Sequence, residues 1–344
     1  MHCRHCRQSR TISNRQAGRT GFSGLDTFYE LKPGLLRDSA LALGFFDGVH
    51  PGHQAVIKKA VAEGQRLGVP AGLVTFKDHP RTLTLGRSPQ LLTLLEQRLD
   101  LFAELGIAKT LVLTFSEEIC RLTPREYVEV VLLDCLGARS VSIGYNHHFG
   151  RNREGDPALL SSLGQELGFE VHIAPEVMVD GVEVSSSRIR AALGAGNVEH
   201  ARRLLSRPYA VDARVVRGQG RGRGIGFPTA NLEISELQVL PGHGVYAAIT
   251  RLADGRRLPS VVNLGYRPTV SNDKIMTAEA HVLDFDQDLY GTGLVVEFWH
   301  HLRAEKKFES IDALRSQIDA DCRKARELFA GSLSLPGPEQ RLHA

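Results

Sequence analysis

The segment Gly-Phe-Phe-Asp-Gly-Val-His-Pro-Gly-His, residues 44–53, connects a predicted strand to a predicted helix and decides the fold of the first half of this chain. The apolar run of residues 40–46 predicts a buried strand. Residues 52–68 carry apolar side chains at helical spacing and end at a glycine, which predicts a helix. A glycine-containing turn of this kind directs backbone amides and the positive end of the helix dipole toward one point, where an anion binds well.

The same alternation of strand and helix continues toward residue 206. Further strands are predicted at residues 71–76, 109–115, 139–145 and 169–174. Helices are predicted at residues 90–106, 124–136, 157–168, 187–194 and 198–205. Strands separated by helices imply a parallel sheet with helices on both faces. We therefore expect a Rossmann-like α/β domain.

The pattern changes near Arg207-Pro208. Short strands follow without predicted helices between them, at residues 209–216, 244–250, 258–263, 277–283 and 294–299. This favours an antiparallel β-barrel, which a terminal helix at residues 311–329 would close. The expected organisation is a basic, disordered extension over residues 1–36, an α/β domain over 37–206, a barrel domain over 207–330 and a tail over 331–344.

Composition limits the function classes. A chain of 344 residues favours two domains, and a net charge of +3 does not indicate a nucleic-acid partner. No apolar run approaches the roughly 18 residues of a membrane span, so no membrane partner is expected. The five cysteines lack the spacing of a disulfide framework, which favours a cytoplasmic location. The sequence leaves the oligomeric state open.

The first twenty residues contain five arginines and no acidic residue. This composition is typical of a disordered tail, and transit peptides share it. Cys3 and Cys6, with His2 and His5 beside them, resemble half of a zinc site. Structural zinc usually needs four ligands from two such pairs. No second pair is present, so we do not predict zinc.

Two histidines and one later segment suggest phosphate chemistry in the first domain. His50 and His53 stand three residues apart at a predicted helix start, where both can reach one phosphate and stabilise its developing charge. Val-Ser-Ser-Ser-Arg-Ile-Arg, residues 184–190, precedes another helix, whose first amides and serine hydroxyls bind phosphate while Arg190 clamps a triphosphate. The structural alternatives are two surface histidines in a turn, and a serine N-cap with a solvated arginine.

A second glycine-rich segment opens the barrel domain. Residues 218–226 contain five glycines interleaved with arginines, and Phe-Pro-Thr-Ala-Asn follows at 227–231. The hydroxyl of Thr229 and the amide oxygen of Asn231 are hard ligands suited to Mg²⁺ that bridges ATP phosphates. The alternative is an arginine–glycine segment that binds RNA.

The ordered combination of motifs resembles known families. His-x-Gly-His near the start of an α/β domain, paired with Ser-Ser-Ser-x-x-Arg near its end, resembles the nucleotidylyltransferase superfamily. The barrel segments resemble riboflavin kinase, with Asn-Leu-Gly-Tyr-Arg-Pro-Thr at 263–269, Ala-Glu-Ala-His-Val-Leu-Asp at 278–284 and Leu-Arg-Ala-Glu-Lys-Lys-Phe at 302–308. Over residues 38–330 the chain resembles the bacterial bifunctional riboflavin kinase/FAD synthetase family.

The resemblance implies two ATP-dependent reactions. Riboflavin would be phosphorylated to FMN, with Glu279 as the general base and with Thr229 and Asn231 holding Mg²⁺ with ATP. FMN would then receive AMP from ATP to give FAD and pyrophosphate, with His50, His53 and Arg190 as catalytic residues. Nucleotide contacts are implied at Gly44, Phe46, Asp47, Gly48, Gly52, Asn146, Ser186 and Ser187 in the first domain, and at Gly218, Gly222, Arg223, Gly226 and Pro228 in the second.

Two positions depart from the family pattern. Phe45 stands where asparagine is common, and Asp78 replaces a proline in the segment at 75–80. These departures keep an alternative open, namely a riboflavin kinase whose first domain binds nucleotide without transferring AMP.

Overall fold

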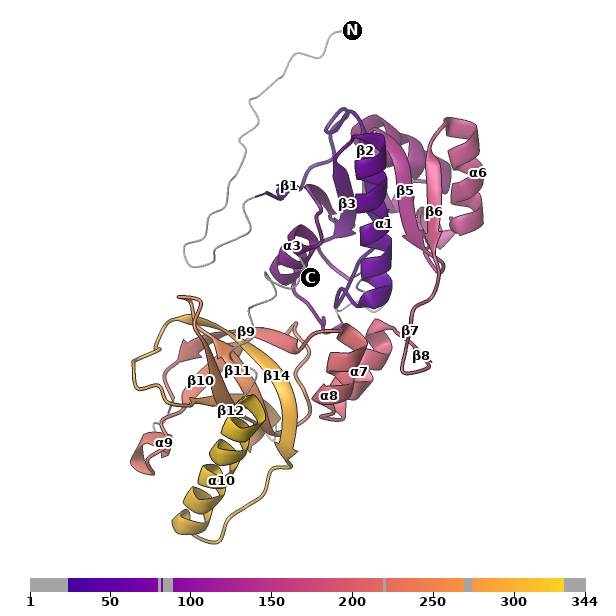
Figure 1. Ribbon diagram of the computed structural model, residues 1–344. Helices are drawn as coiled ribbons and strands as arrows, with labels where there is room; N and C mark the ends of the chain where they lie inside the picture. The colour runs from indigo at the N-terminus through magenta and orange to yellow at the C-terminus, as the bar shows by residue number, and fades with distance from the viewer. Residues whose placement is uncertain (1–23, 80–81, 83–88, 219–220, 269–273, 331–344) are drawn as a thin grey trace.

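A computed structural model of the chain describes residues 24–79, 82, 89–218, 221–268 and 274–330. It confirms the expected fold class, with an α/β domain followed by a barrel domain and a terminal helix (Figure 1).

The first domain is built on a six-stranded parallel sheet in the order β1-β4-β3-β2-β5-β6. Its strands are β1 (Asp26–Phe28), β2 (Ser39–Leu43), β3 (Ala71–Phe76), β4 (Lys109–Leu113), β5 (Ala138–Gly144) and β6 (Glu170–Ala174). The chain leaves β2 toward β3 on one side and later returns to place β5 on the other. This reversal lies between β2 and β5, and ligands of open parallel sheets bind at the carboxyl ends of strands at such a point.

Helices cover both faces of this sheet. α1 (Pro51–Leu67) and α3 (Leu95–Glu104) pack on one face, and the π-helix η1 (Tyr127–Cys135) and α6 (Pro157–Leu167) pack on the other. β2 serves both layers, because Ala42 faces the α1 side while Leu41 faces the η1 side. The shorter elements are α4 (Glu117–Arg121), α5 (Pro124–Glu126), η2 (Arg151–Arg153), β7 (Met178–Val179) and β8 (Val182–Glu183).

The structure corrects two sequence expectations in this domain. The helix predicted over 90–106 begins at Leu95, because the backbone before it bonds elsewhere: Leu91 pairs with Gln238 of the barrel domain. The extension predicted through residue 36 ends earlier, because β1 pairs with β4 and Leu35 packs against the core. β1 has only three residues, which are too few to show the alternation of apolar and polar side chains that predicts a strand. Residues 1–23, with the cysteine pair near the start, lie outside the described ranges.

The second domain is a closed antiparallel barrel in the order β10-β13-β12-β11-β14-β9. Its strands are β9 (Tyr209–Val216), β10 (Ala230–Ile234), β11 (Gly244–Arg251), β12 (Arg257–Pro268), β13 (Lys274–Val282) and β14 (Gly293–Arg303). A short helix, α9 (Arg221–Gly224), precedes β10. The sequence expectation missed β10, although its five residues alternate between apolar and polar, because the first two were taken as part of a turn at residues 227–231. α10 (Ile311–Phe329) covers the outer side of β11 and β12.

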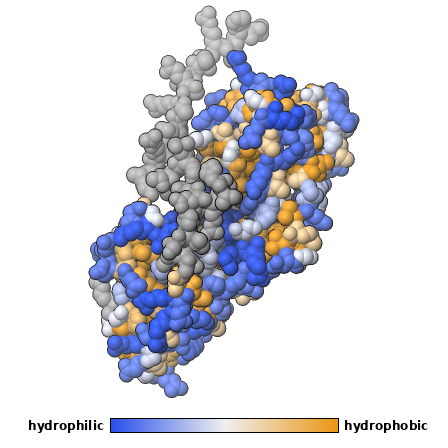
Figure 2. Space-filling model, in the orientation of Figure 1, coloured by the Kyte–Doolittle hydropathy of each residue, from blue (hydrophilic) through white to orange (hydrophobic). Residues whose placement is uncertain are grey.

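One apolar cluster crosses the boundary between the two domains, while the sheet keeps separate clusters on its two faces. α7 (Ser186–Gly194) and α8 (Val198–Leu205) lie where the sheet domain meets the barrel (Figure 1). Their buried residues belong to the same cluster as the barrel interior and Leu92 of the first domain. The outer surface is mixed: Figure 2 shows hydrophilic residues over much of the visible face, with smaller hydrophobic groups between them.

Replacing a residue of this shared core should destabilise the protein strongly. Leu204 in α8 is 0% exposed, so Leu204→Ala should lower the free energy of unfolding by about 2 to 5 kcal/mol through lost burial and a cavity. Leu159→Ala is the matched control, because Leu159 is 37% exposed and should cost less than about 1 kcal/mol. Urea denaturation measures both, and equal costs would contradict the described core.

Candidate active sites

The carboxylate of Asp47, in the loop after β2, organises the first candidate site. It accepts hydrogen bonds from the amides of Leu92, at 2.9 Å, and Thr93, at 3.0 Å, and forms an ion pair with Arg190. The carbonyl of Asp47 accepts a hydrogen bond of 2.9 Å from the hydroxyl of Ser186. Burial raises the pKa of the Asp47 carboxyl, while Arg190 and the two amides oppose that shift. One residue therefore ties three distant segments of the chain together.

The loop itself has an unusual backbone. Phe46 has φ of 58°, Gly48 of 84° and Val49 of 41°. A positive φ is rare for a β-branched residue such as Val49. A Cβ at position 48 would lie 2.8 Å from the Leu92 side chain, so glycine is also required there for space. The buried Phe46 ring packs edge-on against His53, with ring centroids 5.5 Å apart. The Phe46 side chain thus supports the histidine from the core.

The His50 and His53 rings are stacked, with centroids 3.7 Å apart and planes inclined by 21°. Burial, and then the nearby Arg207, lower the pKa of His50 to about 4. Burial, and then the neighbouring His50, Arg207 and Arg98, lower the pKa of His53 well below its ordinary value. Both imidazoles are therefore neutral at neutral pH. Within the described ranges neither Nδ1 atom has a hydrogen-bond partner.

Two helix N-termini border this loop. His50 is the N-cap of α1, and Ser185 caps α7 by accepting a hydrogen bond from the Arg188 amide. Neither helix has an acidic residue in its first turn, so the positive dipole ends are not neutralised locally. An anion in front of these turns would meet backbone amides from two helices.

The remaining predicted contacts of the first site lie at the same edge of the sheet. Gly44 directly follows β2, and Gly52 lies in the first turn of α1. Ser187 is exposed in the first turn of α7. Asn146 is exposed just after β5, the strand beside β2. The structure thus brings the predicted residues of this domain to one edge.

No pattern in the sequence indicated Arg98, whose buried side chain supports this edge of the sheet. Its side chain is fully buried, and it donates to the carbonyls of Phe45, at 2.7 Å, and Phe76, at 3.1 Å. It therefore links the ends of β2 and β3, and burial lowers its pKa to about 10. Its guanidinium lies 4.3 Å from the centroid of the Phe45 ring, which also contacts His79 edge-on. Phe45, which stands where the family commonly has asparagine, thus packs against Arg98 and His79.

The second candidate site is a polar row on the outside of the barrel. Asn231 on β10, Glu279 on β13 and Asn263 on β12 are direct cross-strand neighbours. Such neighbours project from the same face. Leu232 and Ala280, which alternate with members of this row, belong to the core cluster inside the barrel, so the row faces outward.

The glycine-rich segment packs closely on the start of this row. A Cβ at Gly218 would lie 1.9 Å from the Asn231 amide nitrogen, and one at Gly222 would lie 3.0 Å from the Thr229 hydroxyl. The Thr229 hydroxyl lies 3.4 Å from a carboxylate oxygen of Glu279. Hydroxyl, amide and carboxylate oxygens therefore gather beneath this closely packed loop, and such oxygen ligands fit Mg²⁺.

The turn before β10 is held by a residue that the sequence analysis did not assign. His281 Nδ1 lies 2.7 Å from the carbonyl of Pro228, and its ring contacts Phe227 edge-on. Gly226 has φ of 87°, which favours glycine. The main chain of Arg223 lies in α9, but its side chain is outside the described part of the structure.

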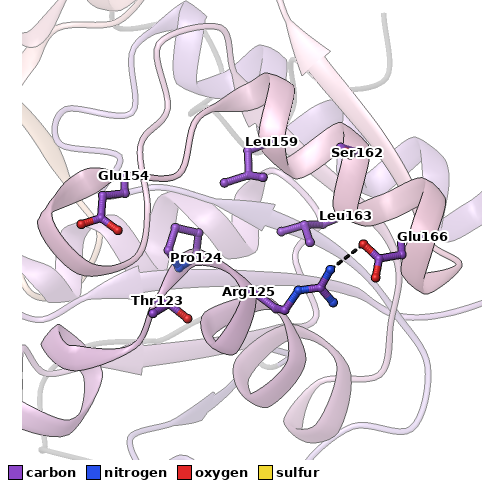
Figure 3. A pocket seen from close by; sticks show the side chains of 8 residues that line it. All are labelled: Thr123, Pro124, Arg125, Glu154, Leu159, Ser162, Leu163 and Glu166. Atoms are coloured by element: carbon purple, nitrogen blue, oxygen red, sulfur yellow. Dashed lines mark hydrogen bonds and ion pairs between the residues drawn. The ribbon is translucent and has the colours of Figure 1, made fainter.

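A cavity of about 480 Å³ lies elsewhere in the first domain, between the start of α5 and α6 (Figure 3). The Arg125–Glu166 ion pair crosses it. No residue predicted for either site lines it. The lining residues are Thr123, Pro124, Arg125, Glu154, Leu159, Ser162, Leu163 and Glu166.

Comparison with known families assigns both halves. A family model described as FAD synthetase matches residues 32–188, and one described as riboflavin kinase matches residues 205–329. A bifunctional riboflavin kinase/FMN adenylyltransferase from Pseudomonas fluorescens is 39% identical, covering 86% of this chain and 94% of the relative. This chain belongs to that bifunctional family. The presence of both domains favours two activities over a kinase alone.

Other relatives agree over similar lengths. The Escherichia coli K12 protein of the same description is 37% identical, covering 84% of this chain and 92% of the relative. A solved structure from Streptococcus pneumoniae, named a macrolide-efflux protein, covers 88% of this chain and 98% of its own, with a TM-score of 0.80 and 28% identity. Among the described residues of this family member, no helix is long and apolar enough to cross a membrane.

Stability should fall in mild acid because of the buried histidines. The pKa of His50 is about 4 in the folded protein against an ordinary 6.5, so the unfolded chain binds a proton in this window that the folded protein does not. The free energy of unfolding therefore falls as pH drops from 6.5 toward 4, by up to about 3 kcal/mol for this group.

Between about pH 7 and pH 5, the melting temperature of the His50→Gln variant should fall by less than that of the unsubstituted protein. Thermal melting at both pH values measures the difference. His243→Gln, at an exposed histidine, is the control and should keep the full pH dependence. An unchanged pH dependence in His50→Gln would contradict the buried neutral state of His50.

Proposed function

We propose that the barrel site phosphorylates riboflavin to FMN and that the first-domain site transfers AMP from ATP to FMN, releasing pyrophosphate. The observation that carries this proposal is that one chain holds two separate polar clusters, one centred in each matching family segment. Asp47 and Ser186 lie in the FAD synthetase match, which ends two residues before Arg190, and the row with Glu279 lies in the riboflavin kinase match.

For the kinase step, we assign Glu279 as the general base that accepts the proton of the ribityl hydroxyl. Its position in register with Asn231 and 3.4 Å from Thr229 supports this role. Thr229 and Asn231 would hold Mg²⁺ with ATP, and the metal would supply neutralisation of phosphate charge. The amides around Gly218, Gly222 and Gly226, with Arg223 and Pro228, would bind the phosphates.

For AMP transfer, the FMN phosphate oxygen attacks the α-phosphorus of ATP and the bond to the β-phosphate bridging oxygen breaks. The uncompensated N-termini of α1 and α7 support binding of the phosphates there. His50 and His53 are neutral and can each donate one N–H to phosphate oxygens. Arg190 donates through Nε to Gln90 and through Nη2 to Asp47. A guanidinium carries five donors, so others remain for a triphosphate.

The boundary between the two activities is also a proposal. The family models leave residues 189–204 between them, which is most of α7 and α8. We place the first domain at 37–206 and the kinase domain at 207–330. α7 belongs functionally to AMP transfer, because it carries Ser186 and Arg190.

Glu279→Gln should abolish FMN formation while leaving FMN-to-FAD conversion within about twofold. Removing a general base typically costs about 100-fold or more, and Glu279 lies on a different domain from the adenylyl site. A time course with riboflavin or FMN, ATP and Mg²⁺, resolved by chromatography, measures both steps. Glu233→Gln, an exposed carboxylate on the same strand as Asn231, is the control. Loss of both activities in a folded Glu279→Gln protein would contradict the assignment.

His53→Asn should show the opposite pattern. FAD formation from supplied FMN should fall by about 100-fold, as for loss of a donor to developing charge. FMN formation from riboflavin should persist and serves as the internal check of folding. Undiminished FAD synthesis would remove His53 from this role, and absence of FAD in the unsubstituted protein would leave only the kinase.

A further inference from the structure

Arg207 begins the proposed kinase domain, yet its guanidinium lies in the first candidate site. Nη2 donates to the carbonyl of Gly48 at 2.6 Å, and Nη1 donates to the carbonyl of Val49 at 3.2 Å. Nη1 also lies 3.4 Å from the carbonyl of Leu205. Arg207, which lies 159 positions after Gly48 in the sequence, therefore binds the loop that precedes His50 and His53.

The two residues that Arg207 binds have positive φ angles. Val49 has φ of 41° and Gly48 of 84°, and such conformations persist only where surrounding contacts impose them. The two carbonyls that accept from Arg207 belong to these same residues. A planar guanidinium can serve both acceptors at once from two separate nitrogens, whereas the three N–H donors of a lysine ammonium all lie on one nitrogen. The sequence position directly after Val49 is His50.

Arg207 also sets the charge near the histidines. It is the charged group that lowers the pKa of His50 after burial, and it acts on His53 together with His50 and Arg98. Among the described residues that shape these two pKa values, no carboxylate contributes. Removing the charge of Arg207 therefore makes protonation of the pair easier, and the pKa values should rise.

A second connection runs from the barrel to residues 91–93, the segment that binds the carboxylate of Asp47. The amide of Leu91 donates to the carbonyl of Leu237 at 2.6 Å, and the amide of Val239 donates to the carbonyl of Leu91 at 2.9 Å. This pairing holds the segment whose next two amides bind the carboxylate of Asp47. The proposed kinase domain thus contacts Gly48 and Val49 directly through Arg207, and supports Asp47 indirectly through its pairing with Leu91.

We propose that Arg207 is a positioning residue for AMP transfer, which fixes the Gly48–Val49 turn so that His50 and His53 face the phosphates of ATP. The proposal rests on the proposed AMP-transfer activity of this site. Arg207 belongs to the proposed kinase domain, so AMP transfer in the first domain would depend on a residue of the second. Arg207 does not contact substrate in this role, because it acts through the two carbonyls.

The test uses the full chain with Arg207→Lys and Arg207→Met, assayed separately for riboflavin phosphorylation and for AMP transfer to supplied FMN. We expect kcat of AMP transfer to fall at least tenfold in both variants, with KM for ATP changing less. Kinase activity should stay within twofold and reports that the protein is folded. Arg256→Met is the control, because Arg256 is an exposed arginine paired with Asp254.

The pH profile separates positioning from general structural support. In Arg207→Met the acid limb of AMP transfer should move to higher pH, since the histidines protonate more easily without the cation. Arg207→Lys keeps the charge and should keep the limb while retaining the lower kcat. Full AMP transfer in both variants, or an equal loss of both activities without a shifted limb, would overturn the proposal. Absence of FAD formation in the unsubstituted protein would overturn both this proposal and the AMP-transfer function.

Discussion

The buried carboxylate of Asp47 is the interaction on which the first site depends. A carboxylate in the interior is costly unless donors surround it, and here Arg190 and the amides of Leu92 and Thr93 supply them. Arg190 and the adjacent amides of Leu92 and Thr93 come from two different parts of the chain. Satisfying one charge therefore fixes the end of β2, the approach to α3 and the start of α7 relative to one another.

The two sites that we propose would bind phosphate by different physical means. The first presents the positive ends of α1 and α7 and a pair of neutral imidazoles. The second presents backbone amides of a glycine-rich loop beside hard oxygen atoms, which suits a metal-bound triphosphate. The difference follows from architecture, because a parallel sheet places helix N-termini at its carboxyl edge while a barrel offers only strands and loops.

The domains are joined more closely than a linker would require. α7 and α8 share one apolar cluster with the barrel interior, and Arg207 and Leu237 reach back toward the loop around Asp47. The proposed AMP-transfer site is thus supported by residues of the barrel domain. This arrangement gives a physical route by which one domain influences the geometry of the other.

Local patterns were sufficient for much of the fold and for the choice of site residues. The alternation of strands and helices, the loss of helices after Arg207 and the motif residues around His53 and Thr229 are all short-range features. The fold class that they predict is confirmed. The roles of individual site residues and the cytoplasmic location remain predictions. β1 was missed because three residues carry too little periodicity, whereas β10 was missed because its first residues were taken as part of the turn at Pro228.

The sequence alone determined the two-domain class, the motif residues and the family resemblance, since each depends on neighbours along the chain. Only the tertiary structure decided that Arg98 and Arg207 support the first site and that His281 holds the turn at Pro228. These contacts join residues separated by 53 to 159 positions. An isolated arginine or histidine has no local pattern that reveals such a partner, because burial and distance arise only when the chain is folded.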